Sequence, residues 1–226
     1  MLRAGQMTEV RGGALTRLPL AMVHDYAAWR ALGSGGLPAN PAGWAVASAL
    51  RLVTRDTTSA EVYAGALSSH PIVLPTRMGG RPRISPHPVP HRQLDQLGSP
   101  LLQEATRKVL ATMVRDRPTV VRHGFSRLER GGDALFTRDL RFAPWLGATH
   151  GEVGHVHHSD GSLHLALPLA DAAVVVGAGW GERHPFAGLP GLSLPLGYLL
   201  VYAPRDHDEV RVVRRLVERA AGVRRA

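Results

Sequence analysis

The chain has 226 residues, 44% of them hydrophobic, and a formal charge of +9, which corresponds to one or two folded domains and excludes a disordered chain. Cysteine is absent, which excludes disulfides, thiolate metal sites and iron–sulfur clusters and leaves the 12 histidines and the carboxylates as candidate reactive groups. The 25 glycines and 17 prolines predict many turns and argue against a helical bundle.

The first part of the chain is predicted to be helical after a loose start. Residues 1–17 show no regular pattern, and residues 18–67 are predicted to form an N-terminal helical region, with helices over 18–32 and 40–53. The second helix begins with Asn40-Pro41, which is a typical N-cap followed by proline at the first helical position.

Residues 68–100 form a proline-rich segment. Helix is excluded over most of it, because proline lacks an N–H donor and clashes with the preceding turn. A stretch of this length without regular structure is either a linker or a functional loop. Because the segment also contains the apolar sequence ISPHPVPHRQ, we expect an ordered loop that packs in extended form across the domain.

Residues 101–226 are predicted to form an α+β domain. The expected elements are a helix over 100–115, hairpins over 119–137 and 152–167, a helix over 170–178, a strand over 197–203 and a last helix. Asp206 and Glu209 form a capping box that begins the last helix. The predicted fold class is therefore α+β: an antiparallel sheet built from hairpins, with N-terminal helices and a β–helix–β–helix C-terminal end.

The most informative motif is HVHHSDGSLHLAL, residues 155–167. Asp160-Gly161 is typical of a two-residue turn in which both central residues have a positive φ, and this register pairs His157 with His164. Because side chains alternate along a strand, His155, His157 and His164 share one face. The other face carries apolar side chains that we expect in the core: Val156, Leu163, Leu165 and Leu167.

Three interpretations of the histidine face stay open. Three imidazoles with an open fourth position are typical of a catalytic zinc site. The same side chains could instead provide a general base and hydrogen-bond donors for an anionic substrate. The face could also be a polar surface that is merely rich in histidine. Glu152 falls on the opposite parity, so it is not expected as a fourth ligand.

A second motif is GWGERHPFAG, residues 179–188. Its glycines and proline predict a tight turn, anchored by Trp180. Arg183 and His184 are adjacent and need polar partners if they are buried. No Lys-Ser or Lys-Thr pair follows the glycines, which excludes a P-loop. An ordinary surface turn is the alternative interpretation.

Several segments of the chain resemble the fungal luciferase family. The more specific ones are His155-x-His157, LHLAL at 163–167, GWGERHPFAG at 179–188 and LVYAPR at 200–205. Upstream, GGLPANPAGW at 35–44, RPRISPH at 81–87 and SRLE at 126–129 follow in the family's order. The resemblance spans about residues 33–220. The family also contains many bacterial luciferase-domain proteins, and we expect this chain to be one of them.

This resemblance implies an oxidation by O₂. Fungal luciferases oxidise the phenolic pyrone 3-hydroxyhispidin and need no flavin. An electron-rich enol reacts with oxygen once it is deprotonated, which requires a base and a cationic partner for the oxyanion. The resemblance implies catalytic roles for five residues: His155, His157 or His164 as the base, and Arg183 with His184 to hold the enolate. His87 and Trp180 are the expected substrate-binding residues.

Three functions are therefore considered. The first is a small-molecule-binding, monooxygenase-like enzyme that uses O₂ as co-substrate and no other cofactor. The second is a non-catalytic module that binds a ligand or docks a partner. The third is a zinc-dependent enzyme, in which the three-histidine face holds a divalent metal ion.

The positive charge does not by itself predict a nucleic-acid partner. Lys108 is the single lysine among the 27 basic residues, the arginines are scattered and aromatics make up only 5%, whereas nucleic-acid surfaces cluster basic and aromatic side chains. No segment contains the ~20 apolar residues that cross a bilayer, and the N-terminus lacks the apolar core of a signal peptide. We therefore expect a soluble, cytoplasmic protein with a small-molecule substrate.

Overall fold

The protein has an α+β fold, as predicted. The computed structural model describes residues 13–33, 35–68 and 70–223. Its helices are α1 (Gly13–Ala31), α2 (Pro41–Leu50), α3 (Pro100–Asp116), α4 (Leu169–Gly177) and α5 (His207–Ala220), with short 3₁₀ helices at Arg51–Val53, Glu61–Tyr63 and Pro144–Leu146. Its strands are β1 (Val121–Phe125), β2 (Asp133–Thr137), β3 (Glu152–Val156), β4 (Leu163–Ala166), β5 (Gly181–Arg183) and β6 (Tyr198–Val201).

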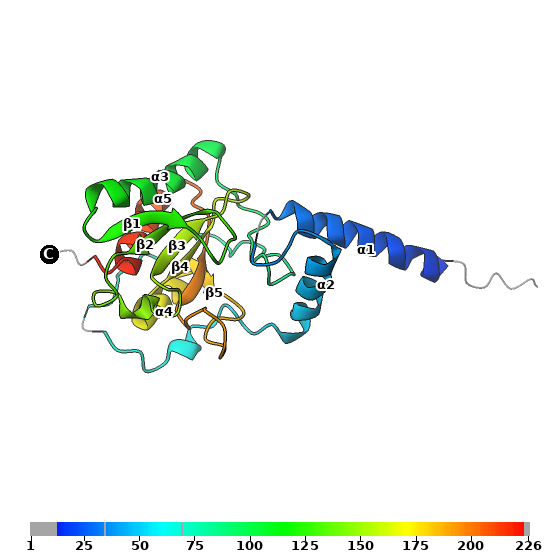
Figure 1. Cartoon of the computed structure of the whole chain (residues 1–226), viewed down its shortest axis with the longest axis horizontal. Coiled ribbons are helices and arrows are strands. Elements are labelled where there is room, and N and C mark those ends of the chain that lie inside the picture. The colour runs from blue at the N-terminus through cyan, green and yellow to red at the C-terminus, as the bar shows by residue number, and fades with distance from the viewer. Residues whose placement is uncertain (1–12, 34, 69, 224–226) are drawn as a thin grey trace, which may run out of the picture.

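The strands form one antiparallel sheet in the order β1-β2-β3-β4-β6-β5. Helices α3 and α5 pack against each other over one face of this sheet (Figure 1). The side chains on that face are apolar, and the four predicted from the hairpin all lie in the core: Val156, Leu163, Leu165 and Leu167. Burial of this face stabilises the fold and leaves the opposite face free to carry polar groups.

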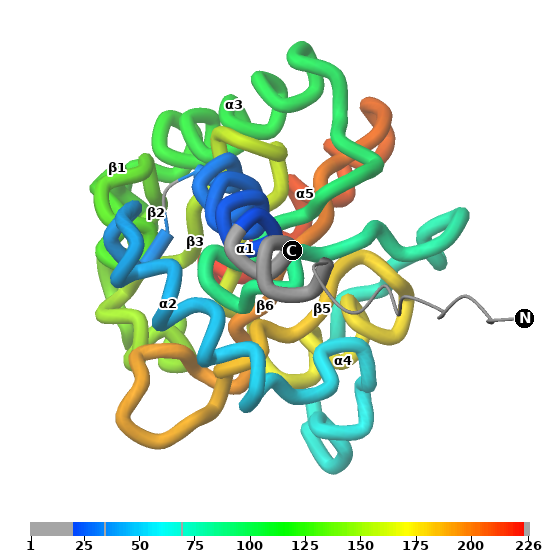
Figure 2. The backbone as a smooth tube through the Cα atoms, turned by 90° about the vertical axis from the view of Figure 1, so that its right-hand side faces the viewer, coloured from blue at the N-terminus to red at the C-terminus, as the bar shows by residue number. Residues whose placement is uncertain are grey.

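The opposite face is covered by the proline-rich segment. Among its described residues, the single β-bridge pairs Ile84 with Gln93. The Gln93 backbone N–H donates to Asp160 in the β3–β4 turn, and its side-chain carbonyl accepts from the Ala203 N–H. The indole of Trp29 in α1 donates to the Val89 carbonyl, which ties α1 to the same segment. Figure 2, which looks nearly along α1, shows this helix in front of the sheet.

The first helix of the N-terminal region begins earlier than predicted. Residues 1–12 of the predicted loose stretch lie outside the described residues, whereas residues 13–17 already belong to α1. The Asn40 side chain accepts from the Gly43 N–H, as expected of an N-cap. The division of the chain at residues 17, 67 and 100 stays a prediction. Among the described helices, none has the length and apolar character needed to cross a membrane.

The histidine hairpin forms with a different register from the predicted one. His155, and not His157, pairs with His164. In the turn, the φ of Gly161 is positive, at +74°, whereas the φ of Asp160 is not. The Gly161 N–H donates to the His157 carbonyl. The connection is therefore longer than a type I′ turn. The register differs by two residues, which preserves the faces, so the three histidines still point the same way.

A β-bulge overturns the expectation for Glu152. Leu135 pairs with Gly154 but the next residue, Phe136, pairs with Glu152, so Val153 is an extra residue in β3. The bulge reverses the alternation and turns Glu152 towards the histidines, with its Oε1 atom 2.7 Å from His155 Nδ1. The prediction was wrong because it assumed an unbroken strand.

Candidate functional site

Five buried histidines gather on the polar face of the sheet: His91, His155, His157, His164 and His184. His164 lies in the middle, and its ring centroid is 4.7 Å from that of His157, 5.4 Å from those of His155 and His184 and 5.7 Å from that of His91. The interpretation as an exposed polar surface was wrong, because the proline-rich segment covers this face. Titratable groups gathered away from water are costly and are typical of functional sites.

Strand pairing brings these histidines together from distant parts of the chain. His155 and His164 are cross-strand partners on β3 and β4, and His157 follows β3 on the same face. His184 directly follows β5 and lies on the same face of the sheet as Glu182. Glu182 and His164 both pair with Leu200 of β6, so they share that face as well. The fifth ring enters from the proline-rich segment. Apolar and polar side chains alternate along these strands, and this alternation places the histidines together on one face of the sheet.

The orientation of His157 is fixed by a relay of hydrogen bonds. Its Nδ1 atom lies 2.8 Å from Ser162 Oγ, and the Ser162 hydroxyl donates to Asp160 at 2.9 Å. Because the hydroxyl donates its own proton to Asp160, it can only accept a hydrogen bond from His157. His157 therefore carries its proton on Nδ1. The Nε2 atom is buried without a hydrogen-bond partner among the described residues and presents a lone pair to the cluster.

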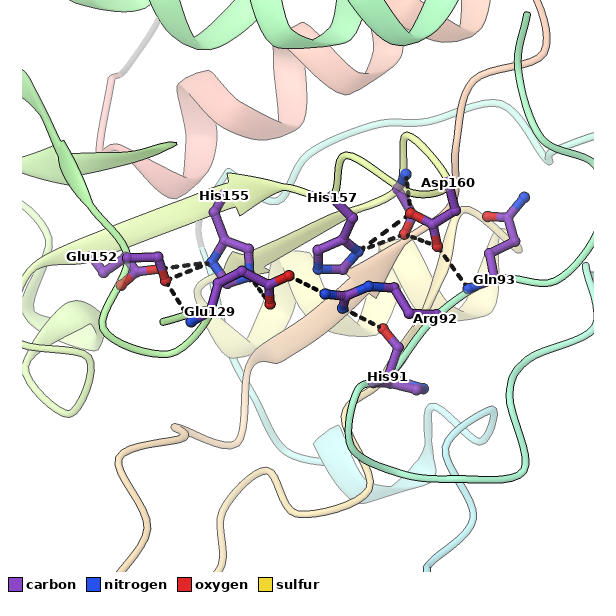
Figure 3. A network of polar contacts seen from close by, with 10 residues as sticks. His91, Arg92, Gln93, Glu129, Glu152, His155, His157 and Asp160 are labelled. Atoms are coloured by element: carbon purple, nitrogen blue, oxygen red, sulfur yellow. Dashed lines mark hydrogen bonds and ion pairs between the residues drawn. The ribbon is translucent and has the colours of Figure 1, made fainter. Parts of the chain in front are cut away.

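His155 lies between two carboxylates (Figure 3). Its Nδ1 atom is 2.7 Å from Glu152 Oε1, and its Nε2 atom is 3.5 Å from Glu129 Oε2. The Ser126 hydroxyl also donates to Glu152, at 2.8 Å. Burial by itself lowers the pKa of His155, but hydrogen bonding and the negative charge of Glu129 and Glu152 outweigh burial and raise the pKa above its ordinary value. His155 is therefore the member of the cluster that favours a positive charge.

The remaining three histidines are held by other polar groups. His164 Nδ1 donates to the Leu199 carbonyl at 3.1 Å, which leaves its Nε2 atom as an acceptor. His184 Nδ1 accepts the Phe186 N–H at 3.2 Å, so its own proton is on Nε2. His91 Nε2 lies 3.1 Å from Glu182 Oε1. The cluster thus contains both hydrogen-bond donors and acceptors at fixed positions.

Burial keeps most of the cluster neutral. Removal from water, together with the positive charge of Arg92, holds the pKa of His157 well below its ordinary value. Burial and the neighbouring rings of His157 and His155 lower the pKa of His164 in the same way, and burial with His91 lowers the pKa of His184. Neutral imidazoles can accept a proton or bind a metal ion, which protonated ones cannot.

A cavity of about 420 Å³ opens onto the cluster. Its polar wall consists of His91, Arg92, Glu129, His155, His164 and His184. Its other wall is apolar and includes Leu50, Val53, Leu128, Phe186, Leu189 and Leu192. Arg92 is buried, pairs with Glu129 and donates to the His91 carbonyl at 3.1 Å. The cavity has the size and the mixed lining of a small-molecule site.

The structure separates Arg183 from the other candidate residues. Strand β5 was not predicted, and in it Arg183 pairs with Leu199, on the face opposite to Glu182 and His184. Its guanidinium donates to the Asp56 carbonyl and does not line the cavity. Neither of the expected substrate-binding residues lines the cavity either: His87 contacts Asp25 and Ser48, and the Trp180 indole donates to the Pro75 carbonyl. Their functional roles stay predictions.

Four polar residues of the site were missed by the sequence analysis: His91, Arg92, Glu129 and Glu152. A signal existed for three of them. His91 and Arg92 lie in ISPHPVPHRQ, whose apolar character already indicated packing, and Glu129 ends the SRLE segment. Glu152 was considered but assigned to the wrong face, because a β-bulge leaves no clear mark in a single sequence.

Comparison with known proteins shows that the chain is similar to luciferases. The sequence model of the family described as "Luciferase domain" matches residues 150–220, which contain β3, β4 and His184. The chain is 31% identical to a luciferase of Neonothopanus nambi and 30% identical to a luciferase of Armillaria mellea. Both alignments cover 88% of this chain and 79% of the relative. No solved structure matches the chain.

Proposed function

The chain belongs to the fungal luciferase family, and on that premise we propose that it is an oxygenase-like enzyme that lets a small electron-rich enol or phenol react with O₂. The observation that carries this proposal is the cavity, with an apolar wall facing a wall of buried histidines. A phenol or hydroxypyrone has the matching shape, with a flat apolar ring and an ionisable hydroxyl.

The chemistry requires that the hydroxyl lose its proton in the cavity. The resulting enolate is electron-rich enough to pass one electron to O₂ and then to form a C–O bond with the reduced oxygen. Return of the proton to the terminal oxygen gives a hydroperoxide, so that one substrate and one O₂ combine without another reductant. The proposed reaction needs no organic cofactor.

The polar groups at the cavity can both stabilise the oxyanion and accept the proton. His184 presents an Nε2–H donor and Arg92 contributes a buried positive charge, and both line the cavity where an oxyanion can lie. The unprotonated Nε2 atoms of His157 and His164 are the acceptor groups of the cluster, and of these two residues only His164 lines the cavity. Of the sequence candidates, His155 fits the role of base least, because two glutamates favour its protonated form.

The proposal is tested by oxygen uptake. We expect the purified full chain to consume O₂ with a hydroxypyrone or an electron-rich catechol, one O₂ per substrate. His164→Ala lowers kcat/KM by about 10²–10⁴-fold, the range for loss of a proton-transfer group, and His123→Ala, which changes an exposed histidine of β1, leaves the rate unchanged. Saturable binding of such compounds without any oxygen uptake contradicts the enzyme and favours the non-catalytic ligand-binding module.

A further inference from the structure

We propose that His155, His157 and His164 form a binding site for one divalent transition-metal ion. The three histidines each offer a ring nitrogen, and these atoms all lie within 4.8 Å of one another. Glu129 Oε2 lies 3.5 Å from His155 Nε2 but does not belong to this group. All three histidine side chains are buried, so the site is built into the fold.

The first argument is how the three imidazoles are held. In each ring the Nδ1 atom faces a hydrogen-bond acceptor: Glu152 for His155, Ser162 for His157 and the Leu199 carbonyl for His164. Metal-ligating histidines are almost always fixed in this way, with one nitrogen donating to a carboxylate, hydroxyl or carbonyl and the other bound to the metal. The same arrangement on three neighbouring rings leaves three Nε2 atoms for one ion.

The second argument is that the Nε2 atom of His157 has no other use. It is buried and has no hydrogen-bond partner among the described residues, and the Nε2 atom of His155 has only a contact of 3.5 Å with Glu129 Oε2. A buried polar atom without a partner is costly and rare in folded proteins. A metal ion bound by both Nε2 atoms satisfies the two histidines at once.

A second group of three histidines, His91, His164 and His184, has similar spacing but fits a metal less well. His184 accepts a backbone N–H on Nδ1 and so carries its proton on Nε2. His91 contacts Glu182 through Nε2, and its buried Nδ1 atom has no hydrogen-bond partner among the described residues. The second group therefore fits less well because of His184, which offers no free nitrogen lone pair.

The donor set indicates the class of ion. Three imidazoles suit Zn²⁺, Fe²⁺, Co²⁺ or Ni²⁺, whereas Mg²⁺ and Ca²⁺ prefer sites made of oxygen atoms. The role of the ion rests on the proposed function: as a Lewis acid beside the cavity, it stabilises an enolate oxygen directly. In that case the three histidines act as ligands, and the substrate proton passes to the Glu129 carboxylate, which lines the cavity.

The experiment is a metal titration of the full chain after treatment with a chelator. We expect Co²⁺ to bind with a stoichiometry of one per chain and with a visible absorption band typical of nitrogen ligation, to be displaced by Zn²⁺ and not by Mg²⁺. His157→Ala removes this binding, and His184→Ala and His123→Ala retain it. Glu152→Gln, which changes the partner of His155 and not a ligand, weakens binding by about 10–100-fold.

Binding that survives His157→Ala and is lost in His184→Ala overturns the assignment in favour of the other histidine group. No saturable binding in the folded wild-type chain overturns the metal site altogether. Circular dichroism identifies variants that fail to fold. If His157→Ala fails to fold, the weaker binding expected of Glu152→Gln supplies the test. Oxygen uptake by metal-free protein contradicts the metal role and leaves the proposed function intact, whereas stoichiometric metal binding without oxidation of any enol contradicts only the function.

Discussion

The imidazole of His157 and the hydroxyl of Ser162 lie 2.8 Å apart, and the hydroxyl in turn donates to the buried Asp160. This relay keeps the Nε2 atom of His157 aimed at the cluster. We predict that Ser162→Ala lowers kcat/KM for enol oxidation by about 10–100-fold, because the ring loses its orienting partner. Steady-state oxygen uptake measures the effect, and Ser159→Ala, at an exposed serine of the same turn, is the control. A variant as active as the wild type contradicts a positioning role for Ser162.

Two arginines that the sequence cannot distinguish have different surroundings. Arg92 lines the cavity, whereas Arg183 lies on the other face of β5. We predict that Arg92→Lys lowers kcat/KM by about tenfold or more, because lysine cannot reproduce the planar guanidinium beside the oxyanion. Arg183→Lys lowers the free energy of unfolding by about 1 kcal/mol through its contact with the Asp56 carbonyl and leaves kcat unchanged.

Kinetics and chemical denaturation of both variants check this difference. If Arg183→Lys abolishes turnover while Arg92→Lys is silent, the role implied for Arg183 by the family resemblance holds and the cavity assignment fails.

The stability of the fold is predicted to depend on pH through Glu209 at the start of α5. Burial by itself raises the pKa of Glu209, but hydrogen bonds from Arg205 and the charge of Arg77 outweigh it and hold the pKa below its ordinary value. Because the folded state binds the proton less readily than the unfolded state, this contribution is present at neutral pH and is lost as the pH falls through the carboxyl range.

Glu209→Gln tests this contribution. We predict that the variant loses about 3 kcal/mol at pH 7, because Arg77 is buried and keeps no charged partner in this pair. The difference from the wild type should shrink towards acidic pH, as measured by urea denaturation at several pH values. A difference that stays constant with pH shows that ionisation of Glu209 does not stabilise the fold.

Much of the fold could be predicted from local patterns, since alternation and capping act over a few residues. The N-cap at Asp206 is an example: its side chain accepts the Glu209 N–H, as the capping box predicts. Glu209, however, accepts the Arg205 N–H and not that of Asp206. The faces of the histidine hairpin were correct although the register was not, because a shift of two residues changes the partners and preserves the faces.

The parts of the site that were missed depend on contacts distant in sequence. His91 meets Glu182 across 91 positions of the chain, and Gln93 meets Asp160 across 67. No periodicity in one sequence reports such a contact. The strand β5 was missed for a related reason: it has only three residues, and its pairing with β6 decides which of Glu182 and Arg183 faces the histidines.

Close packing of β3 on β4 is predicted to require glycine at position 154. A Cβ atom there lies 2.1 Å from the His164 carbonyl oxygen, which is backbone and cannot move aside alone. Gly154→Ala therefore separates the two strands that carry His155 and His164, and costs about 1–3 kcal/mol of stability. Gly177→Ala, at the end of α4 with open space around its Cβ, is the matched control and keeps the wild-type stability. Thermal unfolding measures both, and an equally stable Gly154→Ala contradicts the packing argument.

The last prediction distinguishes two cavities formed by the described residues. The second one, of about 360 Å³, lies under α3 and is lined by Leu110, Val114 and Val156, on the apolar face of the sheet. Leu192→Trp adds bulk to the histidine cavity at a half-exposed position, and we predict that it raises KM for the enol by about tenfold or more, since a poor fit of even one group in a pocket costs that much. Val114→Trp adds bulk to the second cavity and leaves KM unchanged. A reversed result places the substrate on the face of the sheet that carries no histidine of the cluster, and the proposed reaction then loses its base and its oxyanion partners.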